Sequence, residues 1–292
     1  GVVRHEPGEG AVFVSGKQPS RGQVAAHGQQ PVLACFLHGR KVQVVVEHVD
    51  FHDAKKRRVR FLCRVSEVNA PPEVNRLAQM LSTQDLPGWS AQQLACPPGR
   101  PPDVASRIDQ AKRAGVMCLL CPDKAQEWSV VLMLRTADGT AHSGQLAFPG
   151  GSEDPEDAGD LQATAQRECW EEVGVHVTDA AVLGALSPLY IPPSDFWVQP
   201  FVAWSAQTPE FRLQEEEVAD VLVKPLQDFP QAGMRWPSLA VAVRGGRIHA
   251  PGWTCGEHVL WGATAMMMAE LLAVCEGAGF GPSFDVSTQN EG

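Results

Sequence analysis

Apolar and polar stretches alternate along the first hundred residues in a pattern typical of short strands. Residues 1–30 are rich in Gly, Gln and Pro and are expected to be weakly structured. Beyond them, three apolar runs separated by polar turns predict a three-stranded meander: Pro31–Phe36, Val42–Val49 and Val59–Val65. Glu73–Ser82 has helical spacing, and the Pro/Gly-rich segment Pro87–Pro102 predicts a domain boundary.

The remaining residues combine segments of helical periodicity with segments of strand periodicity. Helices are predicted over Asp103–Ala114 and Glu257–Cys275. Six strands are predicted, at Val116–Cys121, Ser129–Leu134, Gln145–Phe148, Ala181–Leu186, Val198–Trp204 and Glu217–Val223. No βαβ repeat dominates, so an α/β fold with a mixed sheet and helices on its faces is expected. The predicted domains are a β-rich extension over 1–99, a main domain over 100–276 and a flexible tail over 277–292.

One predicted helix gathers carboxylates. Glu168, Glu171 and Glu172 stand at i, i+3 and i+4, so their side chains share one face. Like charges at these spacings cost a few tenths of a kcal/mol per pair. They also crowd the helix C-terminus, where Gly174 is a good stop and the macrodipole disfavours anions. The alternative to a cation site is a solvated acidic face.

The surroundings of this helix favour the cation. Phe148-Pro149-Gly150-Gly151 precedes Arg167 by a loop of 15 residues, and a diglycine lets the backbone turn tightly beside a ligand. Asp157 or Asp160 can cap a helix over Leu161–Val173. This order of diglycine, loop and Arg-Glu-x-x-Glu-Glu-x-Gly resembles the Nudix box. The resemblance implies a Nudix-type α/β/α sandwich and a metal-dependent pyrophosphohydrolase.

A narrower resemblance extends over residues 100–276. The segment from His142 to Gly151, with Leu132–Arg135 before it, resembles the signature of the coenzyme A diphosphatase branch. Tyr190–Phe196 and the start of a helix at Trp261 are similar to later segments of that branch. The implied substrate is coenzyme A or an acyl-CoA. The alternatives are an RNA 5′-end or nucleotide pyrophosphohydrolase acting in a larger complex, and a non-catalytic scaffold.

Two departures from the pattern concern the substrate more than the reaction. Thr140 stands where the branch has a second basic residue. The loop between Gly151 and Arg167 is also longer than the common form. Five residues therefore compete to be the acidic residue that the family places in this loop: Glu153, Asp154, Glu156, Asp157 and Asp160.

The resemblance implies roles for individual residues. Glu168, Glu171 and Glu172 would hold Mg²⁺ or Mn²⁺, which prefer oxygen ligands. A backbone carbonyl of Gly150 or Gly151 would assist them. Arg167 would orient a neighbouring Glu while pointing to a different face of the helix.

The general base and the substrate contacts are less determined. Glu217 closes the run Glu215-Glu216-Glu217 and is the candidate base, although a solvated charge run ahead of a strand is the better explanation from sequence alone. Arg135 is a candidate phosphate ligand. His142 and Gln145 flank Gly144 and would contact an adenine, a phosphate or the backbone.

Charge and cysteine content narrow the partners and the compartment. The net charge of −10 argues against broad nucleic-acid binding. The N-terminal extension contains one basic cluster: Lys55, Lys56, Arg57 and Arg58. This cluster is either a solvated turn or a contact for RNA, an acidic protein partner or a membrane surface. No stretch reaches transmembrane length. The eight scattered cysteines favour reduced thiols and an intracellular reducing compartment, with Cys118-x-x-Cys121 as a buried strand rather than half of a zinc site. A homodimer is compatible with the sequence.

Overall fold

The structure is a computed structural model. It describes residues 70–83, 85–100, 110–137, 144–243 and 246–280, together with the backbone of five strands that lie between residues 2 and 66. The chain divides into two compact units, Gly1–Asn69 and Ala70–Gly292. Each unit is described by itself.

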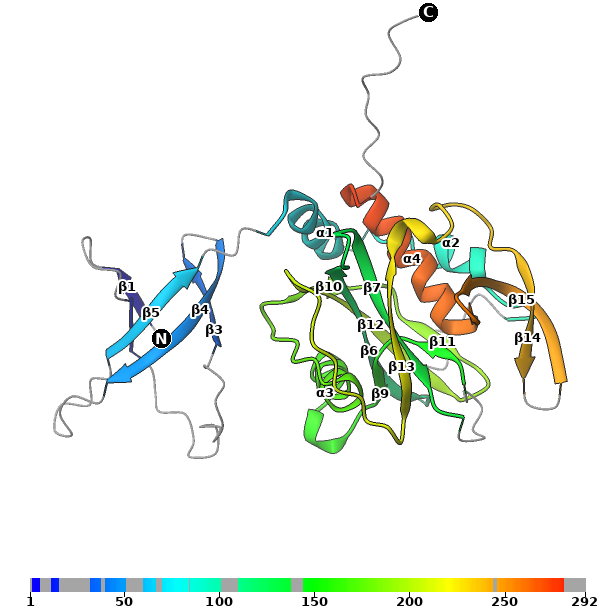
Figure 1. Ribbon diagram of the computed structural model, residues 1–292, viewed down its shortest axis with the longest axis horizontal. Helices are drawn as coiled ribbons and strands as arrows, with labels where there is room; N and C mark the ends of the chain where they lie inside the picture. Colours follow the sequence, from blue (N-terminus) through cyan, green and yellow to red (C-terminus); the bar gives the residue numbers. More distant parts are fainter. Residues whose placement is uncertain are drawn as a thin grey trace, which may run out of the picture. The chain divides into compact units, whose positions relative to one another are not determined.

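The first unit is built from antiparallel strands (Figure 1). Strands β3 (Val32–Leu37), β4 (Arg40–Asp50) and β5 (Arg60–Ser66) form a sheet in chain order, which confirms the predicted meander. A hairpin of β1 (Val2–His5) and β2 (Val12–Ser15) lies where weak structure was expected. Its short Val-rich runs do not stand out as strands in the sequence because Gly and Pro residues surround them. The basic cluster at 55–58 lies outside the described residues.

The second unit contains an eight-stranded mixed sheet with the order β10-β12-β6-β7-β13 and three short strands attached. Its strands are β6 (Lys112–Pro122), β7 (Trp128–Arg135), β8 (Leu146–Ala147), β9 (Gly150–Ser152), β10 (Val182–Ala185), β11 (Leu189–Ile191), β12 (Phe196–Trp204) and β13 (Val218–Pro225). Strands β6 and β12 run parallel, and the other pairs are antiparallel. The predicted mixed sheet is confirmed.

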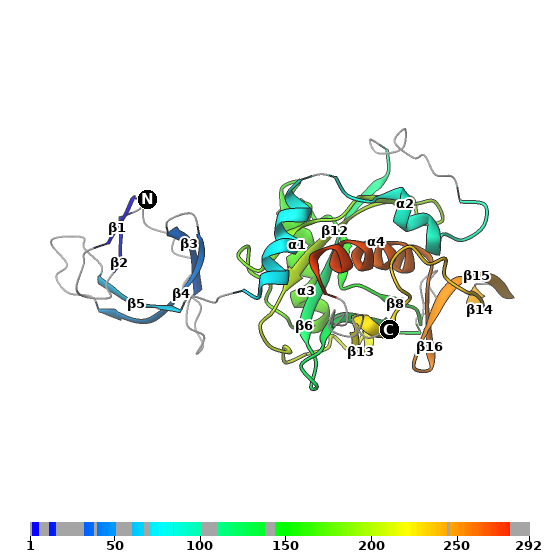
Figure 2. The same ribbon diagram turned by 90° about the horizontal axis from the view of Figure 1, so that it is seen from above.

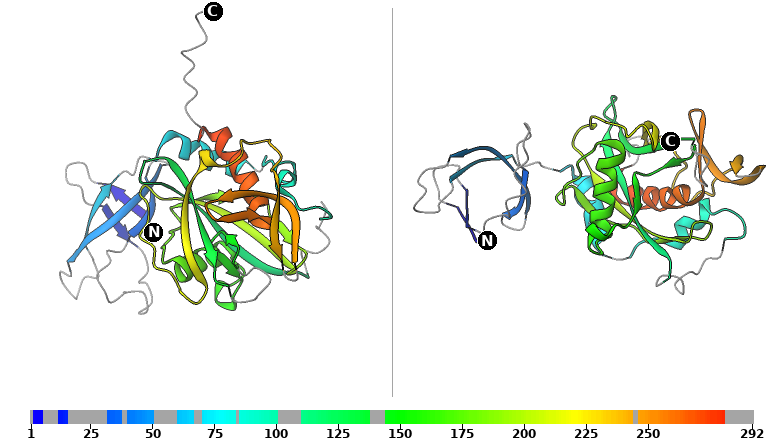
Figure 3. Two further views of the ribbon diagram at one scale, coloured as in Figure 1. Left: turned by 45° about the vertical axis from the view of Figure 1, so that its right-hand side comes forward. Right: turned by 90° about the horizontal axis from the view of Figure 1, so that it is seen from below.

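Helices cover both faces of this sheet (Figures 2 and 3). Alternate residues of a strand point to opposite faces. Met117 and Leu119 of β6 therefore pack with helix α3 (Leu161–Val173), whereas Leu120 packs with α4 (Gly262–Ala278). The same alternation puts the buried Cys118 and Cys121 into different cores, so they do not form one metal site. The result is the α/β/α layering that was expected.

The second unit begins thirty residues earlier than the expected boundary near residue 100. Helices α1 (Pro72–Ser82) and α2 (Trp89–Gln92), with the short 3₁₀ helix η1 (Gln93–Ala95), belong to it. Arg76 Nε donates to the Ala278 carbonyl oxygen at 2.8 Å, which caps the end of α4. The backbone N–H of Trp236 donates to the carbonyl oxygen of Leu94 at 3.0 Å. These contacts attach residues 70–100 to the rest of the second unit, although their Pro and Gly residues are typical of a linker.

Two predicted helices differ from the structure in their bounds. Residues 258–261 form β16 (His258–Trp261), which pairs with β15 (Gly246–Cys255), so the helix predicted from Glu257 begins at Gly262. Lys112–Ala114 belong to β6 because they pair with Phe196–Val198, and residues 101–109 lie outside the described part. The hairpin of β14 (Ser238–Val243) with β15 was not predicted. No helix in the described residues is long and apolar enough to span a membrane.

One carboxylate is fully buried in the apolar helix α4. Glu270 Oε1 accepts hydrogen bonds from the backbone N–H groups of Gly88, at 3.1 Å, and Ser187, at 3.2 Å. Its Oε2 accepts one from Gln92 Nε2 at 2.8 Å. Buried polar groups are costly when they lack a partner, so this carboxylate connects α2 and the segment before β11 to α4.

We predict that Glu270→Ala lowers the free energy of unfolding by about 2–4 kcal/mol, because three donors lose their acceptor. Glu270→Gln retains an acceptor oxygen and should cost less than half as much. Urea unfolding followed by circular dichroism measures both. Equal losses for the two variants would contradict this explanation, because Gln keeps an acceptor oxygen that Ala lacks.

Candidate active site

Helix α3 begins and ends where its sequence indicates. Asp160 accepts hydrogen bonds from the backbone N–H groups of Gln162 and Ala163 and caps the N-terminus. Gly174 adopts φ +71° and ends the helix, with its N–H directed to the carbonyls of the last turn. These caps fix the helix over Leu161–Val173, so its three carboxylates fall in the last two turns.

The diglycine brings β9 against both β6 and α3. Gly150 pairs with Val116, and its φ of +150° is a conformation that favours glycine. Its N–H donates to Glu172 Oε2 at 2.8 Å. A Cβ added to Gly151 would lie 2.6 Å from the carboxyl group of Glu168. The missing side chain of Gly151 therefore leaves room for Glu168, whereas the missing side chain of Gly150 lets β9 pair closely with β6.

Glu172 is the most deeply placed of the carboxylates, with 2% of it exposed. Burial raises its pKa to about 8, and the nearby charges of Glu168 and Glu217 act in the same direction. The Gly150 N–H and Arg135, whose Nη1 lies 3.6 Å from Glu172 Oε1, oppose this rise. The site therefore disfavours a lone anion and favours added positive charge.

Glu168 extends the same electrostatic cluster. Burial raises its pKa, Arg167 opposes the rise, and the charges of Glu171 and Glu217 add to it. Glu217 lies in the exposed turn before β13, where its carbonyl accepts a hydrogen bond from the Thr136 N–H at 2.9 Å. The structure thus places the candidate base close enough to the helix carboxylates for its charge to act on Glu168 and Glu172, although it lies 45 to 49 positions after them in the sequence.

Arg167 contacts two of these carboxylates directly. Its Nη1 donates to Glu168 Oε1 at 2.8 Å and to Glu171 Oε2 at 2.9 Å. Its Nε and Nη2 donate to the two carboxylate oxygens of Asp157 at 3.1 and 3.0 Å. The expectation that Arg167 points to a different helix face is wrong, because the long side chain folds back along the helix to reach its neighbours. Arg167 is well placed to orient them.

Asp157 is the loop acid that this structure selects. Of the five alternatives, Asp157 alone is buried, at the end of the 3₁₀ helix η3 (Pro155–Asp157). It accepts a hydrogen bond from Thr164 Oγ1 at 2.8 Å. Hydrogen bonds from Arg167 are the main reason that its pKa falls to about 2. Spacing alone could not choose it, since four other acids share the loop.

The remaining predicted contacts lie beside this cluster. Arg135 ends β7, and its backbone N–H donates to the Gln145 carbonyl at 3.0 Å. This bond places Gln145 next to Arg135. His142 and Thr140 lie outside the described residues.

Sequence comparisons identify the family of the chain. Residues 111–244 match the model of the NUDIX domain. A Nudix hydrolase NudL of Pectobacterium atrosepticum is 33% identical over 171 residues, which cover 59% of this chain and 86% of the relative. The NudL of Photorhabdus laumondii is 31% identical, with 66% and 97% covered.

This chain belongs to the Nudix family. Members of the family act on diphosphate bonds, so the chain is a hydrolase. The peroxisomal coenzyme A diphosphatase ndx-8 of Caenorhabditis elegans is 36% identical over 128 residues, or 44% of this chain and 54% of that relative. Among solved structures, a NUDIX hydrolase from Alicyclobacillus acidocaldarius has 19% identity and a TM-score of 0.36, with 41% of this chain and 81% of that chain covered.

The carboxylates of Glu168, Glu171 and Glu172 are oxygen donors of the kind that bind divalent cations. Nudix hydrolases generally use metals such as Mg²⁺ or Mn²⁺. Among the described residues, no three acidic, His or Cys side chains are arranged to hold an ion as they stand. The guanidinium of Arg167 bridges Glu168 and Glu171, while the Gly150 N–H engages Glu172. Carboxylate oxygens are the ligands that such cations prefer, so the donor set fits a divalent cation in its chemistry.

We predict that Asp157→Asn destabilises the fold in a pH-dependent way. Folding lowers the pKa of Asp157 from 3.8 to about 2. Its charge therefore stabilises the folded state above pH 4, and this stabilisation is lost as the pH falls toward 2. The variant should lose about 1–2 kcal/mol at pH 7, roughly half as much at pH 3 and little at pH 2, measured by urea unfolding. A loss that does not change with pH would show that charge pairing with Arg167 is not the cause.

Proposed function

We propose that this Nudix hydrolase is a metal-dependent pyrophosphohydrolase that cleaves the diphosphate of coenzyme A or an acyl-CoA. The observation that carries the proposal is the group of interacting carboxylates at the end of α3, with Glu172 buried beneath it. Residues Leu132–Arg135 and Gln145–Gly151 support the substrate, as does the name of the nematode relative. The products are a phosphopantetheine and adenosine 3′,5′-bisphosphate.

The proposed roles follow the geometry of the site. Glu168, Glu171 and Glu172 would hold Mg²⁺ or Mn²⁺, which would offset the phosphate charge and lower the pKa of the attacking water. Arg167, anchored by Asp157, orients Glu168 and Glu171. Asp157 keeps Arg167 in place even when one of its contacts with a carboxylate is released, because that ion pair uses different nitrogen atoms.

Substrate and water are positioned by residues from three other segments. Arg135 and Gln145 contact the phosphates, and the backbone of Gly150 and Gly151 approaches them closely. Water attacks one phosphorus, the P–O bond to the other phosphate breaks, and Glu217 takes the proton that the water loses. Glu217 is exposed at the edge of the cluster, where a water molecule can reach it.

The state of the cysteines in the described residues relates to the redox compartment in which the protein works. Six of them are free and five of those are buried, which supports reduced thiols in an intracellular reducing compartment. Burial raises the pKa of Cys121 and Cys255 to about 11, so these thiols stay protonated and unreactive at neutral pH.

We predict that Glu172→Gln lowers kcat/KM for coenzyme A by several powers of ten, on the order of 3–5 kcal/mol in transition-state stabilisation. Glu217→Gln should lower kcat by about a hundredfold or more. The matched control is Glu215→Gln, an exposed acid of the same run, which should stay within twofold of wild type.

The assay offers coenzyme A, a dinucleoside polyphosphate, NADH, ADP-ribose and 5′-triphosphate RNA with Mg²⁺. Turnover of RNA with coenzyme A untouched would replace the proposed substrate. Turnover of none of these, with metal binding unaffected by Glu172→Gln, would favour a scaffold.

We also predict that replacing Gly151 by alanine impairs metal binding, whereas replacing Gly150 by alanine impairs stability. In Gly151→Ala the new Cβ displaces the carboxyl group of Glu168, so Mn²⁺ affinity should fall about tenfold or more while the fold persists. In Gly150→Ala the new Cβ collides with the backbone of Gly115 at a strained φ, so unfolding free energy should fall by about 2 kcal/mol or more. Calorimetric Mn²⁺ titration and thermal unfolding separate the two. Unchanged Mn²⁺ affinity in a folded Gly151→Ala protein would contradict the role of Glu168.

A further inference from the structure

Two peptide groups set the direction in which the side chain of Glu217 leaves the backbone. One joins Glu216 to Glu217, and the other joins Glu217 to Val218. A planar peptide leaves each residue only two soft dihedral angles, so the orientations of these two groups fix φ and ψ of Glu217 and the line of its Cα–Cβ bond. Contacts that hold both peptide groups therefore direct the carboxylate of the candidate base.

Thr136 holds the carbonyl side of both peptide groups. Its hydroxyl Oγ1 donates to the Glu216 carbonyl oxygen at 2.9 Å, and its backbone N–H donates to the Glu217 carbonyl oxygen at 2.9 Å. Thr136 directly follows Arg135, the last residue of β7, and its own carbonyl oxygen accepts from the Gly144 N–H at 3.2 Å. The chain that carries the candidate phosphate ligand Arg135 therefore also holds the backbone of the candidate base.

The N–H side of the same two peptide groups is held by a single carbonyl. The backbone N–H groups of Glu217 and Val218 both donate to the Gln214 carbonyl oxygen, each at 2.9 Å. The Gln214 N–H in turn donates to the carbonyl oxygen of Glu172 at 3.0 Å, at the end of α3. All four polar groups that flank the Cα of Glu217 are thus hydrogen-bonded, and they connect the turn before β13 to both β7 and α3.

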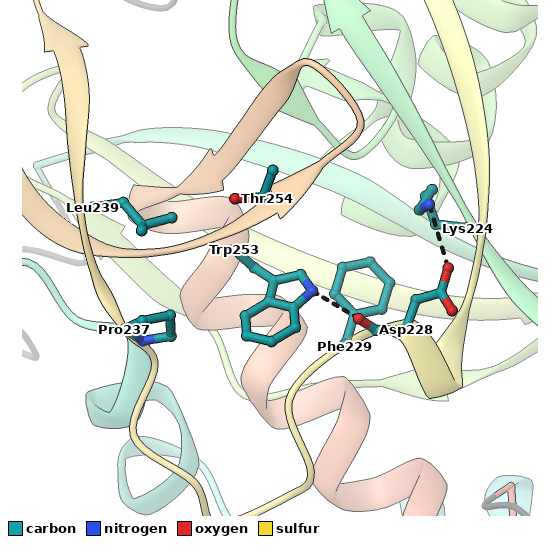
Figure 4. A pocket seen from close by; sticks show the side chains of 7 residues that line it. All are labelled: Lys224, Asp228, Phe229, Pro237, Leu239, Trp253 and Thr254. Atoms are coloured by element: carbon teal, nitrogen blue, oxygen red, sulfur yellow. Dashed lines mark hydrogen bonds and ion pairs between the residues drawn. The ribbon is translucent and has the colours of Figure 1, made fainter.

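The far end of β13 is anchored separately. Lys224 Nζ lies 3.3 Å from Oδ2 of Asp228, the last residue of the 3₁₀ helix η4 (Leu226–Asp228). Trp253 Nε1 donates to the Asp228 carbonyl oxygen at 2.7 Å, beside a cavity of about 310 Å³ that no residue assigned above to catalysis lines (Figure 4). Along an extended strand, Lys224 lies roughly 20 Å from Glu217. Contacts at that distance do not direct the Glu217 carboxylate, so its direction depends on the turn at the near end.

The pairing of β13 with β7 is irregular at this near end. Val218 pairs with Arg135 and Asp220 pairs with Leu134, so Ala219 is an extra residue in β13. Such a bulge interrupts the ladder of backbone hydrogen bonds locally. The bond from the Thr136 hydroxyl to the Glu216 carbonyl is made by a side chain, so it adds to what the ladder supplies beside the bulge.

We propose that Thr136 is a positioning residue for Glu217, whose carboxylate it holds toward the carboxylates of α3 by binding both flanking peptide groups. The assignment rests on the proposed function, in which Glu217 takes the proton that the attacking water loses. Of the two contacts, only the hydroxyl depends on the identity of residue 136, because every residue except proline supplies the N–H. Removal of this hydroxyl is therefore the change that tests the assignment.

Kinetics of three variants with coenzyme A and Mg²⁺ give the first test. Thr136→Val keeps the shape of the side chain but removes its hydroxyl, so kcat should fall about tenfold, because a displaced base transfers protons less well. KM should stay within twofold, and Thr136→Ser should recover at least half of the wild-type kcat. The matched control, Thr208→Val, removes a hydroxyl bond of 2.6 Å to the Pro122 carbonyl oxygen and should stay within twofold of wild type.

A double-mutant cycle determines whether Thr136 acts through Glu217. In a Glu217→Gln background, Thr136→Val should change kcat by less than twofold, because the carboxylate that it positions is already gone. A tenfold loss in both backgrounds, or a rise in KM with kcat unchanged, would overturn the assignment and link Thr136 to substrate binding beside Arg135. Full activity of Glu217→Gln would overturn it as well, while leaving the hydrolase itself in place.

Amide hydrogen exchange separates the assignment from the proposed function, because it needs no turnover. The amides of Glu217 and Val218 should exchange about tenfold faster in Thr136→Val than in wild type, and at wild-type rates in Thr136→Ser and Thr208→Val. Equal exchange in wild type and Thr136→Val would overturn the assignment even if coenzyme A is hydrolysed. Faster exchange in Thr136→Val, with no hydrolysis of coenzyme A by wild type, would support the hold on Glu217 and overturn the proposed function.

Discussion

The close approach of α3 to the β6–β9 pair is the constraint on which the rest of the site depends. Gly115, Gly150 and Gly151 carry no side chain at the three points where these elements meet. A Cβ on Gly115 would collide with the Leu161 carbonyl, and one on Gly151 would collide with the Glu168 carboxyl. Because the backbones approach so closely, the end of α3 is held where Glu172 is buried against a backbone N–H.

That approach creates an electrostatic cost that the neighbouring residues offset. Burial raises the pKa values of Glu168 and Glu172, so their ionised forms are disfavoured without positive charge nearby. Arg167 supplies part of that charge, and Asp157 holds Arg167. The proposed cation would supply the positive charge that these acidic side chains still lack. The Nudix fold therefore positions the site through packing and lets charge determine what the site binds.

The sequence predicts the parts of this arrangement that local chemistry controls. Asp160 and Gly174 fix the ends of α3 through capping, and the period-two runs locate the central strands. Other parts depend on contacts between distant residues. The choice of Asp157 follows from its burial beneath Arg167, and the place of residues 70–100 from the contact between Arg76 and the end of α4. Glu217 approaches the helix carboxylates only because β13 pairs with β7. No local pattern encodes those contacts.

The direction of Arg167 shows the same limit within a single helix. Side-chain spacing places it beside the carboxylates but not among them, whereas Asp157 and the carboxylates draw its guanidinium across the helix face. The limit also applies to β16, whose apolar residues are compatible with a helix in the sequence but pair with β15 in the structure. In both cases the partner lies elsewhere in the chain.

The central claim is that the carboxylates of α3 bind a divalent cation. Anomalous X-ray diffraction from crystals grown with Mn²⁺ and a non-hydrolysable diphosphate tests it most directly. We expect manganese peaks within coordination distance, about 2.0–2.3 Å, of carboxylate oxygens of Glu168 and Glu172, with Arg167 still paired to Asp157. Manganese bound elsewhere, with Arg167 still bridging Glu168 and Glu171, would contradict it.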